Sequence, residues 1–404
     1  MAFEFSVFDA YSDGDNLWFA AIEYNALWRK SLNDDTLEYI GSFPNESMFQ
    51  WRLYTSVCEN DGKLYFIPAS AYEIGVYDMN EKIFSKINIG IKKEENDVND
   101  IRYAKKYVSA FIFDDKLVML PCCYDKVVVY DLISETVETD STLFKALKEK
   151  YRGTITSAEG AFYLCWNARK IDEDNVIFDL HSNANAYIKY NVRKNTWEEY
   201  YAGDEGYSYN FIEYQDGEVW LYDDKKMIIV SCSIMGGEYK TYNLPITKEN
   251  MLISNMFAYG EHLYFLSASG KSVIRFSLKD RLFEYVEELV SKELWFSSVV
   301  VKNDNRICLY APLEQSFVIY QNNKWKFLPC EINRENMIRI KDKAYWEMRK
   351  DGKGLVTEGM ACGVEDFMRV IQYDDFMLQR ENGKYDTRKG LSGHIIYDYL
   401  ISRI

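Results

Sequence analysis

The chain has 404 residues and a formal net charge of −15, with 48% hydrophobic and 27% charged residues. This apolar fraction is ordinary for a folded protein, and the acidic balance excludes general binding to the phosphate backbone of nucleic acids. No apolar run approaches the roughly 18 residues of a membrane-spanning helix, and the N-terminus shows no signal peptide. We therefore expect a cytoplasmic protein with neither a membrane nor a nucleic-acid partner.

Two features of the composition favour strands over helices. Aromatic residues make up 16% of the chain, including 33 tyrosines, whereas there are only 6 prolines. Aromatic rings pack well on a pleated sheet, and proline removes a hydrogen-bond donor from a strand ladder. The sequence therefore predicts an all-β protein.

A short motif recurs along the chain, in which three consecutive apolar residues follow a turn rich in Asp, Gly and Asn. The seven copies begin at Leu17, Leu64, Leu117, Phe162, Val219, Leu263 and Ile307. Their spacing of roughly 44 to 57 residues is typical of the blade-length repeats of β-propellers. A strand with three apolar residues in succession is buried on both faces, as the inner strands of a propeller blade are.

A second position supports this register. Thirteen residues after the first apolar residue of four copies come Tyr77, Tyr130, Phe276 and Tyr320, and the fourth copy places Tyr190 there after a longer gap. Another apolar residue lies seven positions further on, and a short polar turn separates the two, as between Tyr190 and Trp197. This pattern predicts a hairpin made by the third and fourth strands of each blade.

The pairs Tyr77-Asp78 and Tyr130-Asp131, with the stretch from Tyr190 to Trp197, resemble the Tyr-Asp and Trp half of a kelch repeat. The resemblance covers about residues 3–332, although the kelch diglycine after the second strand is missing from every copy. The resemblance implies a kelch-like propeller architecture and is not extended to the partners of kelch proteins.

The repeats define the expected domains. Residues 1–332 are predicted to form one propeller of about seven four-stranded blades, at 3–43, 51–90, 107–140, 154–202, 207–245, 252–290 and 295–331. Residues 333–404 are predicted to form a partly helical C-terminal extension that packs on the propeller, across the junction of the first and last blades. A ring of eight blades that uses part of this extension is the alternative.

Three insertions are expected on one rim of the ring, at 91–106, 140–153 and 166–186. The chain reverses at every strand, so the loops between the second and third strands emerge on the same rim as the connections between blades. The first two insertions lengthen connections between blades, residues 141–151 among them resembling a short amphipathic helix. The third is predicted to lengthen the loop between the second and third strands of the fourth blade. The basic run from Arg102 to Lys106 is predicted to be a solvated face.

Long loops on a rigid scaffold concentrate function, so the third insertion supplies the candidate ligand-binding residues. These residues are Trp166, Asn167, Arg169, Asp172, Asp174 and His181. The tryptophan either stacks on a sugar ring or closes a strand, and the carboxylates either bind a hard cation or form a solvated loop. We predict no metal and no cofactor, because the three histidines are dispersed and no nucleotide motif is present. The eight cysteines are expected to be free thiols.

These observations favour a non-catalytic binding or interaction propeller, whose partner is a protein or a small glycan bound on the rim of the three insertions. Two alternatives stay open. The first is a cytosolic carbohydrate-active enzyme, a glycan hydrolase or lyase, that uses carboxylates and aromatic residues of the same rim. The second is a subunit of a larger assembly, with residues 333–404 as its docking element.

Overall fold

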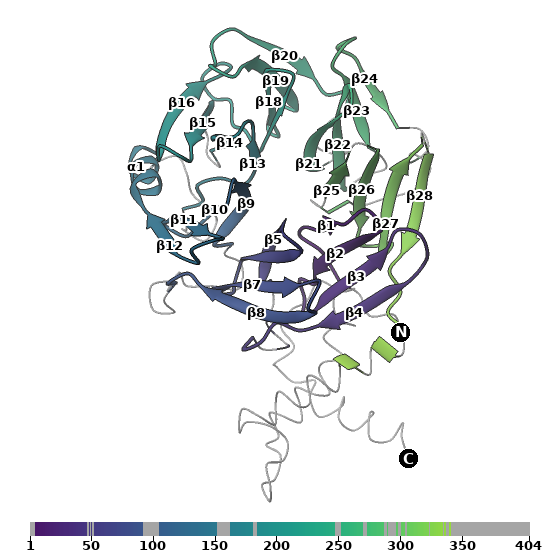
Figure 1. Ribbon diagram of the computed structural model, residues 1–404. Helices are drawn as coiled ribbons and strands as arrows, with labels where there is room; N and C mark the ends of the chain where they lie inside the picture. The colour runs from purple at the N-terminus through teal and green to yellow at the C-terminus, as the bar shows by residue number, and fades with distance from the viewer. Residues whose placement is uncertain are drawn as a thin grey trace, which may run out of the picture.

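The computed structural model of the chain is a β-propeller of seven four-stranded antiparallel sheets arranged in a ring (Figure 1). The structure describes residues 5–46, 48, 50, 52–91, 105–151, 162–180, 184–246, 252–269, 273–286, 289, 296–297, 300–303, 305–322, 324–333, 335–336 and 339–340. The four strands of each sheet are consecutive in the sequence, so every blade comes from one segment of the chain. The predicted all-β propeller of seven blades is confirmed, and within the described ranges there is no eighth blade.

The strands of each blade are named here from the channel outward. The first four blades comprise β1 (Tyr11–Ser12), β2 (Asn16–Ala20), β3 (Leu27–Ser31) and β4 (Leu37–Gly41); β5 (Tyr54–Asn60), β6 (Lys63–Pro68), β7 (Glu73–Asp78) and β8 (Ile83–Asn88); β9 (Tyr107–Phe113), β10 (Lys116–Pro121), β11 (Val127–Asp131) and β12 (Val137–Asp140); and β13 (Ala168–Lys170), β14 (Asn175–Asp179), β15 (Ala186–Asn191) and β16 (Thr196–Tyr201). The last three comprise β17 (Phe211–Gln215), β18 (Glu218–Asp223), β19 (Ile228–Ser233) and β20 (Tyr239–Asn243); β21 (Leu252–Tyr259), β22 (His262–Ser269), β23 (Ile274–Ser277) and β24 (Phe283–Tyr285); and β25 (Val300–Asn303), β26 (Arg306–Ala311), β27 (Ser316–Gln321) and β28 (Lys324–Pro329).

The strand register explains the spacing of the sequence motif. The first apolar residue of a copy and the aromatic residue that follows it are direct cross-strand partners, as Leu64 and Tyr77 are in the second blade. The same pairing joins Leu117 to Tyr130 in the third blade. The Asp-Gly turns before the motif adopt left-handed backbone, and Gly62 at the β5–β6 turn has a φ of 75°. Glycine tolerates this conformation without strain, so the turn signal and the register belong to one hairpin.

The predicted register of the fourth blade is wrong. The apolar triplet that begins at Phe162 lies in no strand, and the second strand of this blade is β14, where Val176 pairs with Tyr190. Residues 168–179 therefore form the first two strands and the turn between them, rather than a long loop. The extra length lies in the connection from β12 to β13, and the triplet is buried there against the side chains of the third and fourth blades.

The connection between the third and fourth blades also contains a helix, α1 (Thr142–Lys150), as the amphipathic pattern predicts. Its apolar face buries Leu143, Phe144 and Leu147 in the core shared by these two blades. Lys150 ends the helix and forms an ion pair of 2.6 Å with Glu199 of β16. A lysine in the last turn also suits the negative end of the helix dipole. The helix thus links the third and fourth blades at one rim.

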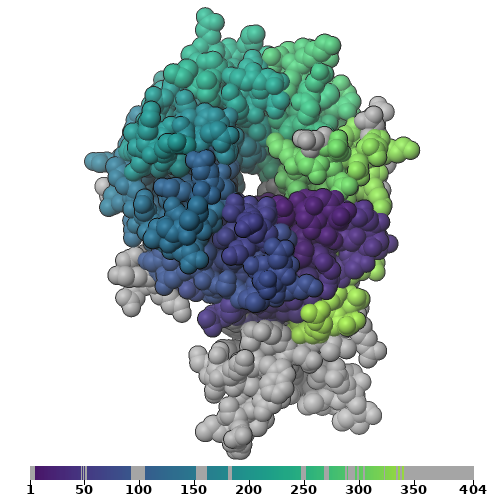
Figure 2. Space-filling model, in the orientation of Figure 1, coloured from purple at the N-terminus to yellow at the C-terminus, as the bar shows by residue number. Residues whose placement is uncertain are grey.

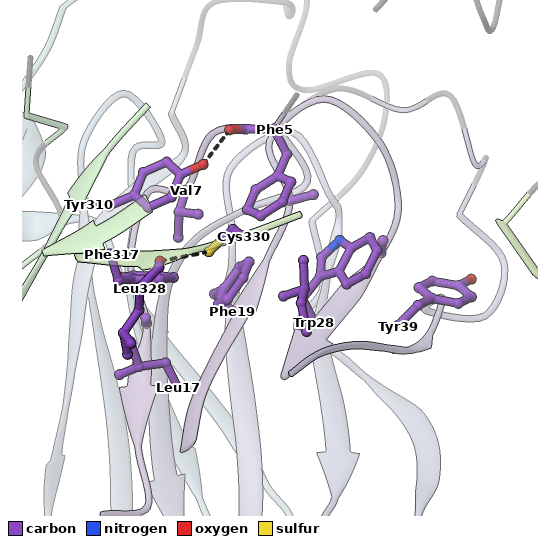
Figure 3. Packing of buried hydrophobic residues seen from close by; sticks show 14 of the residues in the cluster. Phe5, Val7, Leu17, Phe19, Trp28, Tyr39, Tyr310, Phe317, Leu328 and Cys330 are labelled. Carbon is purple, nitrogen blue, oxygen red and sulfur yellow. Dashed lines mark hydrogen bonds between the residues drawn. The ribbon is translucent and has the colours of Figure 1, made fainter. Parts of the chain in front are cut away.

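Among the described residues, the ring closes through side chains and not through a strand shared between the first and last blades (Figure 3). The Tyr310 hydroxyl in β26 donates to the carbonyl of Phe5 at 2.7 Å, and the Gln315 side chain bonds both the amide and the carbonyl of Phe5. The Phe5 ring stacks on Phe19 and Trp28 of the first blade, with centroids 5.5 and 5.8 Å apart. The N-terminal segment therefore fills the seam that a shared strand closes in other rings.

Residues beyond the last strand contact the first blade. The Asn336 side chain donates to the carbonyl of Leu37 at 2.8 Å and accepts the amide of Tyr39 at 3.2 Å, both in β4. Ile340 is buried in the core that the first and last blades share. These contacts lie at the junction where the extension is expected to pack. Residues 341–404 lie outside the described residues, so the boundary at 332 and the rest of the extension stay predictions.

Candidate functional site

The centre of the ring is open, and the space-filling view shows the opening (Figure 2). A cavity of about 340 Å³ occupies this channel, and all seven blades contribute to its wall through the first strand or the residues just before it. Among its charged residues are Asp9, Lys105, Arg169 and Lys302. Innermost strands alternate inward and outward side chains, so each blade contributes only a few groups to the channel.

Three charged side chains from different blades meet in the channel wall, and we name Arg169, Glu213 and Lys302 the channel triad. The Arg169 guanidinium and the Glu213 carboxylate are 2.9 Å apart, and the Lys302 ammonium lies 3.6 Å from the same carboxylate. Arg169 also donates to the carbonyls of Ala168 and Met256. The triad therefore links the fourth, fifth, sixth and seventh blades.

Glu213 is almost fully buried, at 3% exposure. Burial by itself raises the pKa of a carboxyl group, but Arg169 and Lys302 outweigh burial and hold the pKa of Glu213 below its ordinary value. The carboxylate also accepts the backbone amide of Ala258 at 3.2 Å. Glu213 is thus an anion whose role is to hold two cations and the β21 backbone in place.

A second group of side chains lies where the connections between blades enter the channel, and we name Phe8, Asp9, Lys105, Trp166 and Asn167 the channel mouth. The Lys105 ammonium lies 4.2 Å from the centroid of the Phe8 ring and 5.2 Å from that of Trp166. No hydrogen bond or ion pair joins this ammonium to the described residues. Burial lowers the pKa of Lys105 to about 8.

Asp9 lies in the same cavity, just before β1. Its carboxylate accepts the Ser56 hydroxyl at 2.8 Å and the amides of Val57 and Ala10 at 3.1 and 2.9 Å. Burial nevertheless raises the pKa of Asp9 to about 6, because the three hydrogen bonds only partly offset the desolvation. The mouth therefore carries a carboxyl group and an ammonium group that both titrate within two pH units of neutrality.

A buried carboxyl group beneath the mouth positions Trp166 and Asn167. Asp179, at the end of β14, accepts the backbone amides of these two residues at 3.2 and 2.7 Å. Glu23 and Asp223 accept the amides of Ser6 and Ser208 in the same way in the first and fifth blades. Asp179 is fully buried, and burial raises its pKa to about 8. The second oxygen of Asp179 and the side-chain oxygen of Asn167 are buried without a hydrogen-bond partner among the described residues.

The structure separates the predicted ligand residues into two groups. Trp166, Asn167 and Arg169 line the channel cavity, and Trp166 keeps 38% of its surface exposed. Asp172 and Asp174 lie in the β13–β14 turn, on the opposite rim. Asp172 accepts amides within its own turn, and Asp174 pairs with Arg193 at 2.9 Å. His181 lies outside the described residues.

Arg193 also pairs with Asp114 at 3.1 Å, across the gap between the third and fourth blades. A groove of about 540 Å³ lies here, lined by Glu173, Arg193 and the outer strands of both blades. Asp114 and Asp174, the two carboxylates that pair with Arg193, lie in exposed turns. Arg193 therefore joins the acidic β13–β14 turn of the fourth blade to Asp114 of the third blade.

The sequence patterns missed Asp9, Lys105, Glu213 and Lys302, which stand in or before first strands that no repeat motif marks. The prediction of a solvated face for the run from Arg102 to Lys106 is wrong at its end. Lys106 is 3% exposed and donates to the carbonyls of Ala69 and Ser70. Its position in the sequence does not signal this burial, because Lys116, which also directly precedes an apolar run, is exposed.

In the described part of the chain, no group of three or more His, Cys, Asp or Glu side chains is arranged to hold a metal ion. No helix there is both long and apolar enough to cross a bilayer. Seven cysteines in these ranges are free thiols, as expected, and burial raises the pKa of Cys58 to about 12.

No family model and no curated protein matches the chain. Among solved structures, YCF48 from Cyanidioschyzon merolae is 11% identical with a TM-score of 0.58, over 79% of this chain and 96% of that one. The extracellular domain of BT4673 from B. thetaiotaomicron is 12% identical, with a TM-score of 0.55, over 82% of this chain and 42% of that one. PorZ, a surface component of the type-IX secretion system of Porphyromonas gingivalis, is 10% identical, with a TM-score of 0.52, over 81% and 38%. At these identities the likeness shows the propeller fold alone.

Proposed function

We propose that this chain is a non-catalytic binding propeller whose binding surface is the channel mouth. The observation that carries the proposal is Lys105, a half-buried cation with ring contacts but no polar partner among the described residues, beside the exposed ring of Trp166. Leaving a cation partly desolvated is costly, and a bound ligand or partner recovers that cost. A few polar groups converging on a concave, aromatic-lined cavity are typical of a binding site.

The surroundings of the mouth support this choice. Residues 105–106 and 162–167, the described ends of the connections before β9 and β13, lie on this rim. Long connections on a rigid scaffold commonly carry binding residues. Two of the similar structures are described as an extracellular domain and a bacterial surface component. The free buried thiols of this chain support a reducing compartment instead, and we propose the cytoplasm.

A native pull-down tests the proposal. The full chain is captured from its host and its bound molecules are identified by native mass spectrometry, in parallel with Trp166→Ala and Lys105→Met. Ile133→Ala and Lys194→Met, in exposed turns of the opposite rim, are the matched controls. We expect the wild type and both controls to retain the same molecule and both mouth variants to lose it. Equal retention by all five proteins, or an empty wild type, contradicts the proposal.

Asp9 favours a second candidate, a carbohydrate-active enzyme on the same rim. A carboxyl group with a pKa near 6 is suited to general acid catalysis, and Trp166 is placed to stack on a sugar ring. Incubation with a glycan panel, followed by chromatography of the products, tests this alternative. Products that disappear with Asp9→Asn, but not with Asp216→Asn in an exposed turn, support it. Intact glycans with the wild type eliminate it.

The kelch-like repeat and the C-terminal extension are also proposals. The cross-strand position of Tyr77 and its counterparts supports a kelch-like repeat. The contacts of Asn336 and Ile340 support an extension, over 333–404, that packs on the junction of the first and last blades and docks a partner there. Removal of 333–404 is expected to lower the melting temperature. An unchanged melting temperature contradicts the packing.

A further inference from the structure

The cavity behind the channel mouth has a size suited to a small molecule. Its volume of about 340 Å³ is near the lower end of the range for small-molecule sites, roughly 300 to 1,000 Å³. Its wall consists of the rigid first strands and the residues just before them, in all seven blades. A channel walled by strands on its sides and open at its mouth suits a compact ligand rather than a protein surface.

The charges in this cavity favour an anion, although the whole chain carries −15. Glu213 is shared by two cations, Arg169 and Lys302, so the channel triad keeps a surplus of one positive charge. Asp9 accepts three hydrogen bonds from the protein, whereas Lys105 has no anionic partner at hydrogen-bonding distance among the described residues. Three cations therefore face two carboxylates, and the cation without a partner lies at the mouth.

The groups next to Lys105 indicate what accompanies the negative charge. An ammonium group has three N–H donors, and the Phe8 and Trp166 rings satisfy none of them with a lone pair. A ligand carboxylate recovers these donors as charge-assisted hydrogen bonds. The Asn167 side-chain oxygen is a buried acceptor without a partner among the described residues, which suits a ligand hydroxyl.

We propose that the channel mouth binds a small carboxylate-bearing sugar, with the carboxylate on Lys105, a hydroxyl on Asn167 and the sugar ring against Trp166. This inference rests on the proposed function and names the class of ligand. A sugar acid combines an anion, hydroxyl donors and an apolar ring face in one compact molecule. The mouth offers a counterpart to each of the three.

The pH dependence of binding follows from the groups that face Lys105. These are Asp9, Arg52 and the Cys122 thiol. Burial raises the pKa of Asp9 to about 6, so its negative charge, which competes with the ligand, is lost as the pH falls through 6. Burial lowers the pKa of Lys105 to about 8, so the cation is lost as the pH rises through 8. Affinity for the acid is therefore expected to be greatest below pH 6 and to fall steeply above pH 8.

Isothermal titration calorimetry on the full chain tests the inference with glucuronate and galacturonate. Glucose and galactose are the matched neutral probes, and inorganic phosphate is the anion without a ring. We expect both uronates to bind at least ten-fold more tightly than the neutral sugars and phosphate. Lys105→Met is expected to lose at least ten-fold in uronate affinity, Lys105→Arg to retain part of it, and Lys194→Met to retain all of it.

Three outcomes overturn the inference: neutral sugars that bind as tightly as uronates, phosphate that binds as tightly as uronates, or uronate affinity that survives Lys105→Met. Melting temperatures are measured for every variant, and Lys105→Arg provides a second test should Lys105→Met fail to fold. Absence of uronate binding, together with loss of the native molecule from mouth variants in the pull-down, rejects the sugar acid and leaves the binding surface in place. If uronates do not bind and the mouth variants also keep the native molecule in the pull-down, the proposed function is rejected as well.

Discussion

Replacing Glu213 by glutamine removes the negative charge that holds the channel triad while keeping the shape of the side chain. Removing one partner of a buried ion pair typically costs about 3–5 kcal/mol. In this chain the two cations keep other acceptors, since Arg169 bonds two carbonyls and Lys302 bonds the carbonyl of Ala258 at 2.9 Å. Their side chains are also 23% and 39% exposed, so water solvates part of each charge.

We therefore expect Glu213→Gln to lower the free energy of unfolding by about 2 kcal/mol, below the range for a fully buried pair. Equilibrium urea unfolding at pH 7, followed by tryptophan fluorescence, measures this loss. Glu218→Gln is the matched control, because Glu218 lies in the same blade as Glu213 and forms a half-exposed pair of 3.1 Å with Arg281 of the sixth blade. Exposed pairs contribute about 0–1 kcal/mol, so the control is expected to lose much less.

The pH dependence gives an independent check. The pKa of Glu213 is lower in the folded chain than in the unfolded one, so its stabilisation is present above the unfolded pKa. That stabilisation is lost as the pH falls through the folded pKa, and the wild type and Glu213→Gln should converge in acid. Equal losses for Glu213→Gln and Glu218→Gln at pH 7, or a difference that persists unchanged in acid, refute the reasoning.

Three further changes have defined outcomes. Asn336→Ala removes two hydrogen bonds to β4 and is expected to cost about 1–2 kcal/mol, measured by urea unfolding. Asp179→Asn is expected to stabilise the chain increasingly from pH 5 to 8, by at most about 1.4 kcal/mol per pH unit, because the raised pKa of Asp179 makes the wild type lose stability as the pH rises towards 8. Gly75→Ala should destabilise the chain by about 1–3 kcal/mol, because its Cβ would lie 2.6 Å from the Tyr54 hydroxyl oxygen; the melting temperature measures this.

Each of these outcomes has a clear contrary result. An Asn336→Ala chain as stable as the wild type shows that the segment after β28 contributes nothing to ring closure. A constant difference between Asp179→Asn and the wild type across pH shows that Asp179 does not take up a proton on folding. A Gly75→Ala chain with an unchanged melting temperature shows that the packing of β7 against Tyr54 is looser than the structure has it.

The blade repeat could be predicted from the sequence because each blade is a local structure. Leu117 and Tyr130 are thirteen positions apart because one tight turn joins β10 and β11 and makes them cross-strand partners. Burial on both faces makes the second strand apolar at successive positions, and such a pattern needs no distant residue to be recognised. Six of the seven copies begin within the second strand of a blade, so local patterns were enough to predict the ring of blades.

The fourth blade shows where local patterns fail. The triplets that begin at Phe162 and at Val176 both follow polar stretches of sequence, and both are buried. The first is buried by α1 and neighbouring blades, and the second by its place within a sheet. An apolar triplet indicates that its residues are buried but not which part of the protein buries them. Only the tertiary packing therefore decided which triplet is a strand.

The candidate site, in contrast to the blades, could not be predicted from local sequence patterns. Asp9, Lys105, Arg169, Glu213 and Lys302 each stand in or before a different first strand, and nothing local relates them. The sequence pattern placed Arg169 in a loop together with Asp172 and Asp174, which lie on the opposite rim in the structure. The sequence by itself determined the propeller fold and favoured seven blades over eight, because hairpins are local. Only the closed ring decided which charges share the channel, because closure brings together residues as far apart as Asp9 and Lys302.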